Sequence, residues 1–234
     1  MPEKLTFKIF GFTEQEVLKK LSDDGLTPLL VEEACRDAKV VLTAEDAQKD
    51  RMAFRVYSLF AGCVYRESDG TLAETVLERL RLYNQTLSVA ESCTGGLIAS
   101  DLVEVPGCSE CFMEGIVSYS NRAKTVRLGV NPVTLSTYGA VSGEVACQMA
   151  TGLMREGVNY AVSTTGIAGP GGGSETKPVG LVYIAVADEI NCSATECRFD
   201  GTRNEIRRLA ANTALFLLWK RLVKPIDFDS MVIE

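Results

Sequence analysis

The sequence of 234 residues contains no histidine. This absence excludes mechanisms that use imidazole as the base and metal sites that need an imidazole ligand. Long apolar runs are also missing, because the longest, near 181–187 and 214–219, fall well short of the roughly 20 residues of a membrane-spanning helix. The opening MPEKLTF lacks the apolar stretch of a secretion signal. We therefore expect a cytoplasmic protein without a membrane partner.

Basic residues are too few to suggest nucleic-acid binding. Lys and Arg number 24 against 31 Asp and Glu, so the formal net charge is -7, and no basic stripe runs along the chain. A protein that follows a phosphate backbone needs clustered cations. We expect no direct nucleic-acid partner.

Cysteine is well represented, with eight residues, but their spacing argues against a metal site. Cys108 and Cys111 form one C-x-x-C pair, whereas Cys192 and Cys197 have four residues between them, and no histidine is available to complete a mixed set of ligands. We expect reduced thiols that pack as small hydrophobic side chains, with no metal and no cofactor.

Residues 1–66 have the pattern of a small α+β domain. The sequence predicts strands near 5–10, 26–31 and 39–43, a helix opened by the capping box Thr13-x-x-Glu16, and a closing helix near 44–59. The G-x-x-G loop with which KH modules hold a nucleic-acid backbone is missing, so we expect a structural role. A polar stretch at 67–70 precedes a second capping box, Thr71-x-x-Glu74, which predicts a domain boundary there.

Residues 67–234 alternate between helix and strand, which is the order of an α/β domain. The helices are predicted at 71–84, 94–104, 121–127, 142–154 and from 203 onward, and the strands at 86–90, 112–119, 160–164, 179–187 and 192–199. A third capping box, Thr202-x-x-Glu205, opens the last helix. The expected fold class is a three-layer α/β/α domain with a mixed sheet, preceded by the small α+β domain.

The segment LSVAESCTGGLIAS at 87–100 carries the strongest indication of chemistry. An apolar run meets Ser92, then a Gly95-Gly96 pair and a helix-like run, so Ser92 is predicted at a strand-to-helix turn. Such a turn exposes a hydroxyl and directs unpaired backbone N–H groups toward an approaching group, as acyl transfer requires. Cys93 is the rival nucleophile, but the histidine that usually activates a cysteine is missing.

A serine nucleophile in a chain without histidine needs a lysine, a carboxylate or a tyrosinate as its base. Tyr119 and Lys124 flank a predicted strand end and are candidates. Lys124 would need a pKa near 7 or 8 instead of about 10.4, a shift that burial can supply. The alternative is a solvated Lys124 on a helix surface and a Tyr119 packed in the core. Glu91 points away from Ser92 if both lie on one strand, so it supports the site at most.

A second glycine-rich segment, STTGIAGPGGG at 163–173, follows a predicted strand. Glycines there let backbone N–H groups approach an anion or a sugar closely. A dinucleotide-binding loop is one interpretation, but Pro170 interrupts the motif and 177–180 lead into a strand. The segment also fails as a P-loop, and Tyr119 and Lys124 miss the Tyr-x-x-x-Lys spacing of short-chain dehydrogenases by one residue. A purely structural glycine turn stays open.

Six segments occur together in a recognisable order: AESCTGG at 90–96, YSNRAK at 119–124, LGV at 128–130, GAVS at 139–142, GIAGP at 166–170 and KPVG at 177–180. From about Thr71 to Leu222 the chain thereby resembles the CinA C-terminal (PncC) family of nicotinamide-nucleotide amidases. The resemblance implies hydrolysis of nicotinamide mononucleotide to nicotinate mononucleotide and ammonia, in pyridine-nucleotide salvage, with no metal for this step. It also implies a homodimer.

By this resemblance, Ser92 attacks the carboxamide carbon while Lys124 and Tyr119 handle protons. The backbone at 94–96 is expected to stabilise the oxyanion, and the loop at 165–169 to hold the ribose phosphate. The residues expected to bind substrate are Thr94, Gly95, Gly96, Asn121, Ser142, Thr165, Gly166, Ala168 and Gly169. Of these, Asn121 and Ser142 have helix capping as an alternative role. Arg203 either meets the phosphate or only begins the last helix.

Residues 1–66, with KIFGFTEQ at 8–15, resemble the KH-like middle segment of full-length CinA proteins. The pyrophosphatase domain of those proteins has no counterpart in this sequence, so we do not expect its metal-dependent chemistry. Two other hypotheses stay open, a Ser-Lys hydrolase of another amide and a nucleotide-binding, competence-associated interaction protein without turnover. A dehydrogenase ranks below both. The order in which Lys124 and Tyr119 accept protons is also open.

Overall fold

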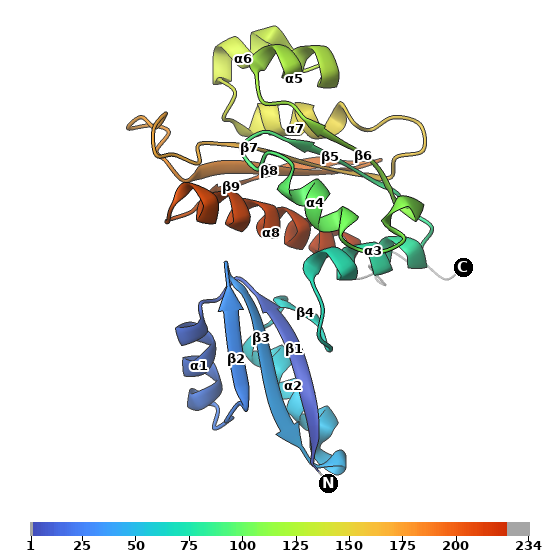
Figure 1. Ribbon diagram of the computed structural model, residues 1–234, viewed down its shortest axis with the longest axis vertical. Helices are drawn as coiled ribbons and strands as arrows, with labels where there is room; N and C mark the ends of the chain where they lie inside the picture. The colour runs from blue at the N-terminus through green and yellow to red at the C-terminus, as the bar shows by residue number, and fades with distance from the viewer. Residues whose placement is uncertain (1, 224–234) are drawn as a thin grey trace, which may run out of the picture.

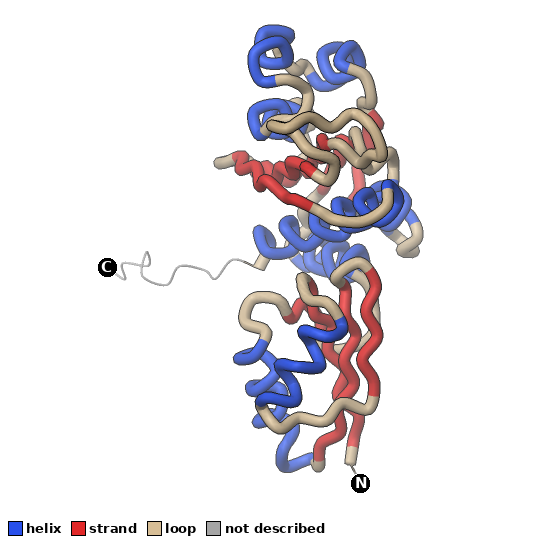
Figure 2. Tube along the Cα trace, turned by 90° about the vertical axis from the view of Figure 1, so that its left-hand side faces the viewer, coloured by secondary structure: helices blue, strands red, loops and turns tan. Residues whose placement is uncertain are grey.

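The structure is a computed structural model that describes residues 2–223. Its N-terminal part is a four-stranded antiparallel sheet in the order β2-β3-β1-β4. The strands are β1 (Glu3–Phe10), β2 (Leu30–Ala34), β3 (Asp37–Ala44) and β4 (Val64–Arg66). Helices α1 (Glu14–Asp23) and α2 (Lys49–Leu59), the latter preceded by the 3₁₀ turn η1 (Asp46–Gln48), cover one face of this sheet (Figure 2). Apolar side chains of both layers form one buried core.

The predicted capping box of α1 is confirmed, since Thr13 and Glu16 exchange both hydrogen bonds. The second strand was predicted too early. Pro28 has no N–H for a strand ladder, and β2 begins only at Leu30. It ends in a tight turn in which Cys35 and Arg36 adopt left-handed backbone angles, a hairpin geometry usually signalled by Asn-Gly. The second helix begins at Lys49 rather than near 44, and β4 was not predicted.

The C-terminal part is a five-stranded mixed sheet in the order β6-β5-β7-β8-β9. The strands are β5 (Leu87–Glu91), β6 (Phe112–Val117), β7 (Tyr160–Gly166), β8 (Leu181–Asp188) and β9 (Cys192–Arg198). β5 runs parallel to both β6 and β7, whereas β8 and β9 are antiparallel to their neighbours. The carboxyl ends of β5, β6 and β7 therefore lie at the same edge of the sheet.

Helices cover both faces of this sheet, so the predicted three-layer α/β/α domain with a mixed sheet is confirmed (Figure 1). One layer contains α3 (Leu72–Leu82), α4 (Leu97–Val103) and α8 (Arg203–Leu222), and the other contains α5 (Asn121–Leu128), α6 (Pro132–Tyr138) and α7 (Gly143–Thr151). Alternation along the strands divides the core. Val89 packs in the cluster of the first layer, whereas its neighbour Ala90 packs in that of the second.

The capping boxes predicted at Thr71 and Thr202 are both present. Two helices differ from expectation. α4 begins at Leu97 rather than 94, because Gly95 and Gly96 have φ angles of 62° and 98° and cannot belong to a right-handed helix. The short α6 was missed, although Asn131 followed by Pro132 is a helix start, and the 3₁₀ turn η2 (Cys108–Glu110) precedes β6.

The N-terminal sheet contacts helix α8 of the C-terminal part through aromatic side chains. The rings of Phe10 and Phe216 lie 4.6 Å apart, and those of Tyr65 and Trp219 lie 6.4 Å apart, measured between centroids. The boundary expected between residues 66 and 67 falls between β4 and α3, and the division into two domains stays a prediction. No helix between residues 2 and 223 is long and apolar enough to cross a membrane.

Candidate active site

Ser92 directly follows β5, at the sheet edge where the ends of the parallel strands meet. Its backbone N–H donates to Thr164 O of the neighbouring strand at 3.0 Å, which fixes where the chain leaves the sheet. The residue is 8% exposed and its hydroxyl faces a cavity. The predicted strand-to-helix turn is therefore present, although the helix starts five residues after the serine.

Lys124 contacts Ser92 directly. It lies in the first turns of α5, whose start is capped by the Ser120 hydroxyl accepting from Ala123 N–H at 3.1 Å. The Nζ atom donates to Ser92 Oγ at 2.9 Å and to Ser118 O at 2.8 Å. With only 1% of the residue exposed, burial lowers the pKa of Lys124 to about 8. The alternative of a solvated lysine on the helix surface is wrong.

Glu91 holds the turn that follows Ser92. Its Oε2 accepts from Gly96 N–H at 2.8 Å and Ile98 N–H at 3.3 Å, and its Oε1 accepts from Ala99 N–H at 2.9 Å. The amide of Gly96, just before α4, and those of Ile98 and Ala99 within it are thus already engaged. The expectation that Gly96 N–H binds an oxyanion is corrected accordingly, because this group holds the turn.

The same turn is held from the other side by α8. Arg207 donates to Cys93 O at 3.1 Å and to Thr94 O at 2.8 Å. Its guanidinium lies so close to Gly95 that an added Cβ would come within 3.2 Å of it. The hydroxyl of Thr94 is buried against that of Thr164 at 2.7 Å, so its side chain supports the turn and lies outside the cavity lining.

Cys93 lies beside the serine but is poorly suited to be the nucleophile. It is 6% exposed, and burial raises the pKa of its thiol to about 11, against the smaller opposing effect of the Cys93 and Thr94 backbone N–H groups. At neutral pH almost none of it is thiolate. The contact between Lys124 Nζ and Ser92 Oγ favours the serine.

The cavity in front of Ser92 has a volume of about 210 Å³ and gathers side chains from segments far apart in the sequence. Its lining residues are Ser92, Cys93, Tyr119, Lys124, Ala140, Val141, Thr165, Gly166, Ala168 and Arg203. The three predicted catalytic residues therefore come together with three of the nine residues predicted to bind substrate, Thr165, Gly166 and Ala168. Sequence reasoning missed Ala140 and Val141, which belong to the GAVS segment used for the resemblance but to which no role was given.

Tyr119 and Arg203 line the cavity from different segments. Tyr119 is 63% exposed, so the alternative that it packs in the core is wrong. Arg203, the first residue of α8, donates from Nη2 to Tyr119 Oη at 3.3 Å and from Nη1 to Gly169 O at 2.6 Å. The guanidinium thus joins the glycine-rich loop to Tyr119, and Gly169 contributes its carbonyl.

The wall formed by Ala140 and Val141 is fixed by two hydrogen-bond donors. Thr165 Oγ1 donates to Ala140 O at 2.7 Å. Lys177 Nζ donates to Tyr138 O at 2.6 Å and to Val141 O at 2.7 Å. The hydroxyl of Thr165, expected to bind substrate, is therefore used to hold this wall, and Lys177 of the KPVG segment has the same task.

Two of the weaker candidates lie away from the cavity lining. Asn121 is exposed at the start of α5 and borders a separate shallow hollow beside α6. Ser142 caps α7, accepting from Val145 N–H at 3.3 Å and donating to Gly139 O at 3.0 Å. For Ser142, the capping role weighed from the sequence is the one observed.

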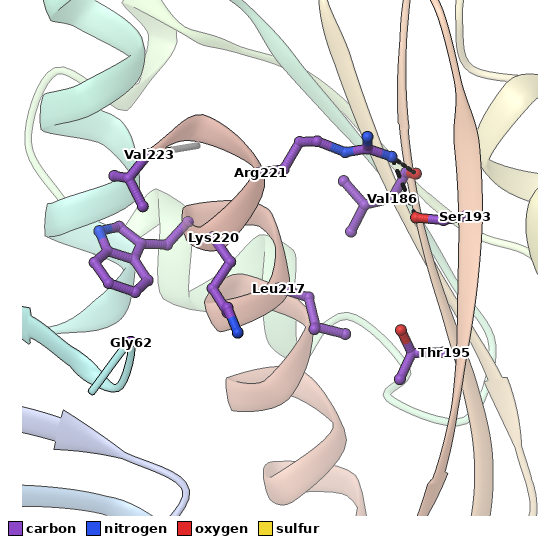
Figure 3. A pocket seen from close by; sticks show the side chains of 9 residues that line it. Gly62, Val186, Ser193, Thr195, Leu217, Lys220, Arg221 and Val223 are labelled. Atoms are coloured by element: carbon purple, nitrogen blue, oxygen red, sulfur yellow. Dashed lines mark hydrogen bonds between the residues drawn. The ribbon is translucent and has the colours of Figure 1, made fainter. Parts of the chain in front are cut away.

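A larger cavity of about 450 Å³ lies elsewhere, between the carboxyl end of α8 and the strands β8 and β9 (Figure 3). Arg221 borders it and donates to Val186 O and Ser193 Oγ, while Leu217 and Thr195 face each other across it. None of the predicted site residues lines it. Between residues 2 and 223, no group of three or more Cys, Asp or Glu side chains is placed to hold a metal ion, and all eight cysteines are free thiols.

Comparisons with known proteins identify the C-terminal part of the chain. A family model described as the CinA C-terminal domain matches residues 69–222. A CinA-like protein of Fusobacterium nucleatum is 47% identical over 174 residues, which are 74% of this chain and 42% of the relative. A CinA-like protein of Acidobacterium capsulatum is 43% identical over 187 residues, 80% of this chain and 45% of that protein. The chain thus spans less than half the length of these relatives.

Solved structures agree with this assignment. The competence/damage inducible protein CihA of Agrobacterium tumefaciens superposes with a TM-score of 0.63 at 47% identity, covering 65% of this chain and 94% of that one. A CinA superfamily protein of Escherichia coli gives a TM-score of 0.61 at 33% identity, covering 63% of this chain and 87% of the other. Both matches indicate that the part of this chain they cover has the fold of those two proteins.

Proposed function

The chain belongs to the CinA C-terminal domain family, and from this premise we propose that it is an amidohydrolase that converts nicotinamide mononucleotide to nicotinate mononucleotide and ammonia. The observation that carries the hydrolase part is the contact of Ser92 Oγ with the buried Nζ of Lys124 at 2.9 Å. The substrate comes from the resemblance of the motif set to nicotinamide-nucleotide amidases. The homodimer that the same resemblance implies, and the cytoplasmic location expected from the sequence, belong to the proposal.

In the first half-reaction, neutral Lys124 accepts the Ser92 proton while Oγ attacks the carboxamide carbon. The resulting ammonium is held by Ser118 O, which already accepts from Nζ at 2.8 Å. The tetrahedral intermediate collapses with cleavage of the C–N bond, and Lys124 returns the proton to the departing amine, which leaves as ammonia. An ester between Ser92 and nicotinate mononucleotide remains.

In the second half-reaction, water replaces ammonia. Lys124 takes a proton from a water molecule, the hydroxide adds to the ester carbonyl, and the C–O bond to Ser92 breaks as Oγ recovers its proton. The products are the carboxylic acid, which ionises at neutral pH, and free enzyme. One lysine thus serves both halves, as its pKa near the working pH permits.

The oxyanion of both tetrahedral intermediates needs hydrogen-bond donors other than the backbone N–H groups at the start of α4. Glu91 engages the amides of Gly96, Ile98 and Ala99. The backbone N–H groups of Cys93 and Thr94 act on the Cys93 sulfur beside Ser92. We assign the Cys93 amide to the oxyanion, since the backbone N–H next to the nucleophile is the usual donor in acyl transfer, and we assign the Thr94 amide as the second donor.

The size of the cavity suggests how a mononucleotide binds. About 210 Å³ is less than the roughly 300–1,000 Å³ common for ligand sites, so the cavity suits the nicotinamide ring and not the whole mononucleotide. We place the ribose phosphate outside the cavity. There the Arg203 guanidinium can bind it, and the backbone of 165–169 lets it approach closely. Tyr119, exposed beside Arg203, contacts the substrate on the same side.

The test is ammonia release from nicotinamide mononucleotide by the purified chain, compared with nicotinamide riboside, which lacks the phosphate. Turnover that falls by at least about 10³-fold in Ser92→Ala and prefers the phosphorylated substrate supports the proposal. Equal rates for the two substrates favour a Ser-Lys hydrolase of another amide, the second candidate, because the Ser92–Lys124 contact requires no phosphate. Thermal stabilisation by the mononucleotide without ammonia release favours a binding protein.

A further inference from the structure

The carboxylate next to the nucleophile is buried and has backbone partners. Glu91 is 1% exposed, and both of its oxygens accept from N–H groups at 96–99. A buried carboxylate at a helix N-terminus is stabilised there by these hydrogen bonds and by the helix dipole. Its place in the sequence, one residue before Ser92, connects the start of α4 to the end of β5.

Glu91 therefore holds both ends of the turn that contains Ser92. Residues 92–96 lie between the Glu91 backbone, which belongs to the sheet, and the Glu91 side chain, which holds the start of α4. From α8, the Arg207 side chain donates hydrogen bonds to the backbone carbonyls of Cys93 and Thr94. The Gly96 amide of this turn is thus held from β5, and its Cys93 and Thr94 carbonyls are held from α8.

We propose that Glu91 is a positioning residue for the nucleophile. It fixes the turn so that Ser92 Oγ stays within hydrogen-bond distance of Lys124 Nζ, and Arg207 completes the same support from α8. The inference rests on the proposed role of Ser92 as nucleophile, and it does not depend on which amide is the substrate.

The substitution Glu91→Gln tests this with little change of volume. The carboxylate oxygens accept three N–H bonds, whereas a glutamine amide has one oxygen and presents an NH2 group to N–H donors. At least one of the bonds is lost, and the turn relaxes. A displacement of about 1 Å in a reacting group can cost roughly 100-fold in rate.

The matched control is Glu74→Gln. The Glu74 carboxylate likewise accepts from a backbone N–H at a helix start, that of Thr71 at 2.7 Å, but it belongs to α3 and is absent from the Ser92 cavity. Both substitutions remove a capping interaction and lower the melting temperature. Only Glu91→Gln is expected to affect the serine.

The experiment measures modification of Ser92 by a sulfonyl fluoride, identified by mass spectrometry, beside kcat and KM for nicotinamide mononucleotide. We expect Glu91→Gln to lower the labelling rate and kcat by about 10- to 100-fold, with KM changed less than about threefold, and Glu74→Gln to change none of them by more than about twofold. Labelling at the wild-type rate in Glu91→Gln overturns the inference. Labelling does not require turnover, so a protein that labels normally yet leaves the mononucleotide intact refutes only the proposed substrate.

If the Glu91→Gln protein fails to fold, a second pair of variants tests the same inference. Arg207→Met removes the two donors to the turn from a half-buried position, and Arg208→Met, its control, removes the neighbouring contact with Asp101 on α4. We expect slower labelling of Ser92 in Arg207→Met and an unchanged rate in Arg208→Met. Equal rates in the two arginine variants contradict the proposed support of the turn.

Discussion

The Nζ of Lys124 lies 2.9 Å from the Oγ of Ser92, and the lysine is almost completely buried. Thirty-two residues separate the two in the sequence, and β6 and the first turns of α5 bring the lysine to the end of β5. In a chain without histidine, this contact provides a base whose pKa, about 8, is close to physiological pH.

The first prediction concerns the dependence of activity on pH. Lys124 must be neutral to accept the serine proton, and burial lowers its pKa to about 8. We expect kcat/KM to rise about tenfold per pH unit below pH 8 and to level off above it, so that the value at pH 7 is about one tenth of the plateau. Steady-state rates between pH 6 and 9.5 measure this. A flat profile over that range would exclude Lys124 as the base.

The same burial predicts an effect on stability. The pKa of Lys124 is about 8 in the folded chain and near 10.5 in the unfolded one, so between these values the unfolded state binds more protons. The free energy of unfolding therefore increases as the pH rises from 8 to 10.5, and below pH 8 the folded state bears the full cost of charging the lysine. At about 1.4 kcal/mol per pKa unit, that cost is about 3 kcal/mol.

Lys124→Met should accordingly unfold at higher urea concentration than the wild type at pH 7, although it is inactive. Part of the 3 kcal/mol is offset by loss of the hydrogen bonds to Ser92 and Ser118, so we expect a gain of about 1–2 kcal/mol. The control is Lys19→Met on exposed α1, which should stay within about 0.5 kcal/mol of wild type. A destabilised Lys124→Met would show that the lysine is held without a desolvation cost.

The third prediction separates the two adjacent nucleophiles. Cys93 has a thiol pKa near 11 and lies beside Ser92 in the cavity. Cys93→Ser should retain kcat within about threefold, whereas Ser92→Ala should lose at least about 10³-fold. Ammonia release measures both. An active Ser92→Ala together with an inactive Cys93→Ser would reverse the assignment of the nucleophile.

Much of this arrangement could be predicted from local patterns. Three capping boxes marked the starts of α1, α3 and α8, because the Thr and Glu side chains satisfy amides within a few residues of each other. The Gly95-Gly96 pair marked the turn after β5 for a similar reason, since only glycine adopts those backbone angles readily. The α/β order of the C-terminal part followed from periodicity.

The misses depended on contacts between distant segments. The sequence predicted that Glu91 faces away from Ser92, but no pattern showed that its carboxylate reaches the amides of Gly96, Ile98 and Ala99 at the start of α4. Arg207 and Lys177 hold backbone carbonyls of other segments, 113 and 36 residues away, and such bonds leave no signal in local sequence. The assignment of Gly96 to an oxyanion failed for the same reason.

The fourth prediction concerns the order of proton transfer, which the sequence left open. Lys124 donates directly to Ser92, whereas the exposed Tyr119 hydroxyl accepts a hydrogen bond from Arg203. Tyr119→Phe should lower kcat by about 3- to 30-fold and keep the limb of the pH profile near 8, because the first acceptor is untouched. A pH–rate profile of this variant is the measurement. Disappearance of that limb would make Tyr119 the first base.

The fifth prediction concerns the cavity wall. Lys177 donates to Tyr138 O and Val141 O, and each charge-assisted bond of this kind contributes about 1.5–3 kcal/mol. Lys177→Met leaves these carbonyls to water and loosens the segment that contributes Ala140 and Val141 to the cavity, while the Ser92–Lys124 contact keeps its own partners. We therefore expect KM for nicotinamide mononucleotide to rise about tenfold and kcat to change less than about threefold.

Two further measurements test whether Lys177 acts by holding the cavity wall. Lys177→Arg retains the charge and donors, so it should recover part of the loss in KM, whereas a lysine that acted only through its field would be replaced completely by arginine. Labelling of Ser92 by a sulfonyl fluoride should proceed at the wild-type rate in both variants, because the nucleophile's turn is held by Glu91 and Arg207. Slower labelling in Lys177→Met would instead mean that the wall and the nucleophile's turn move together.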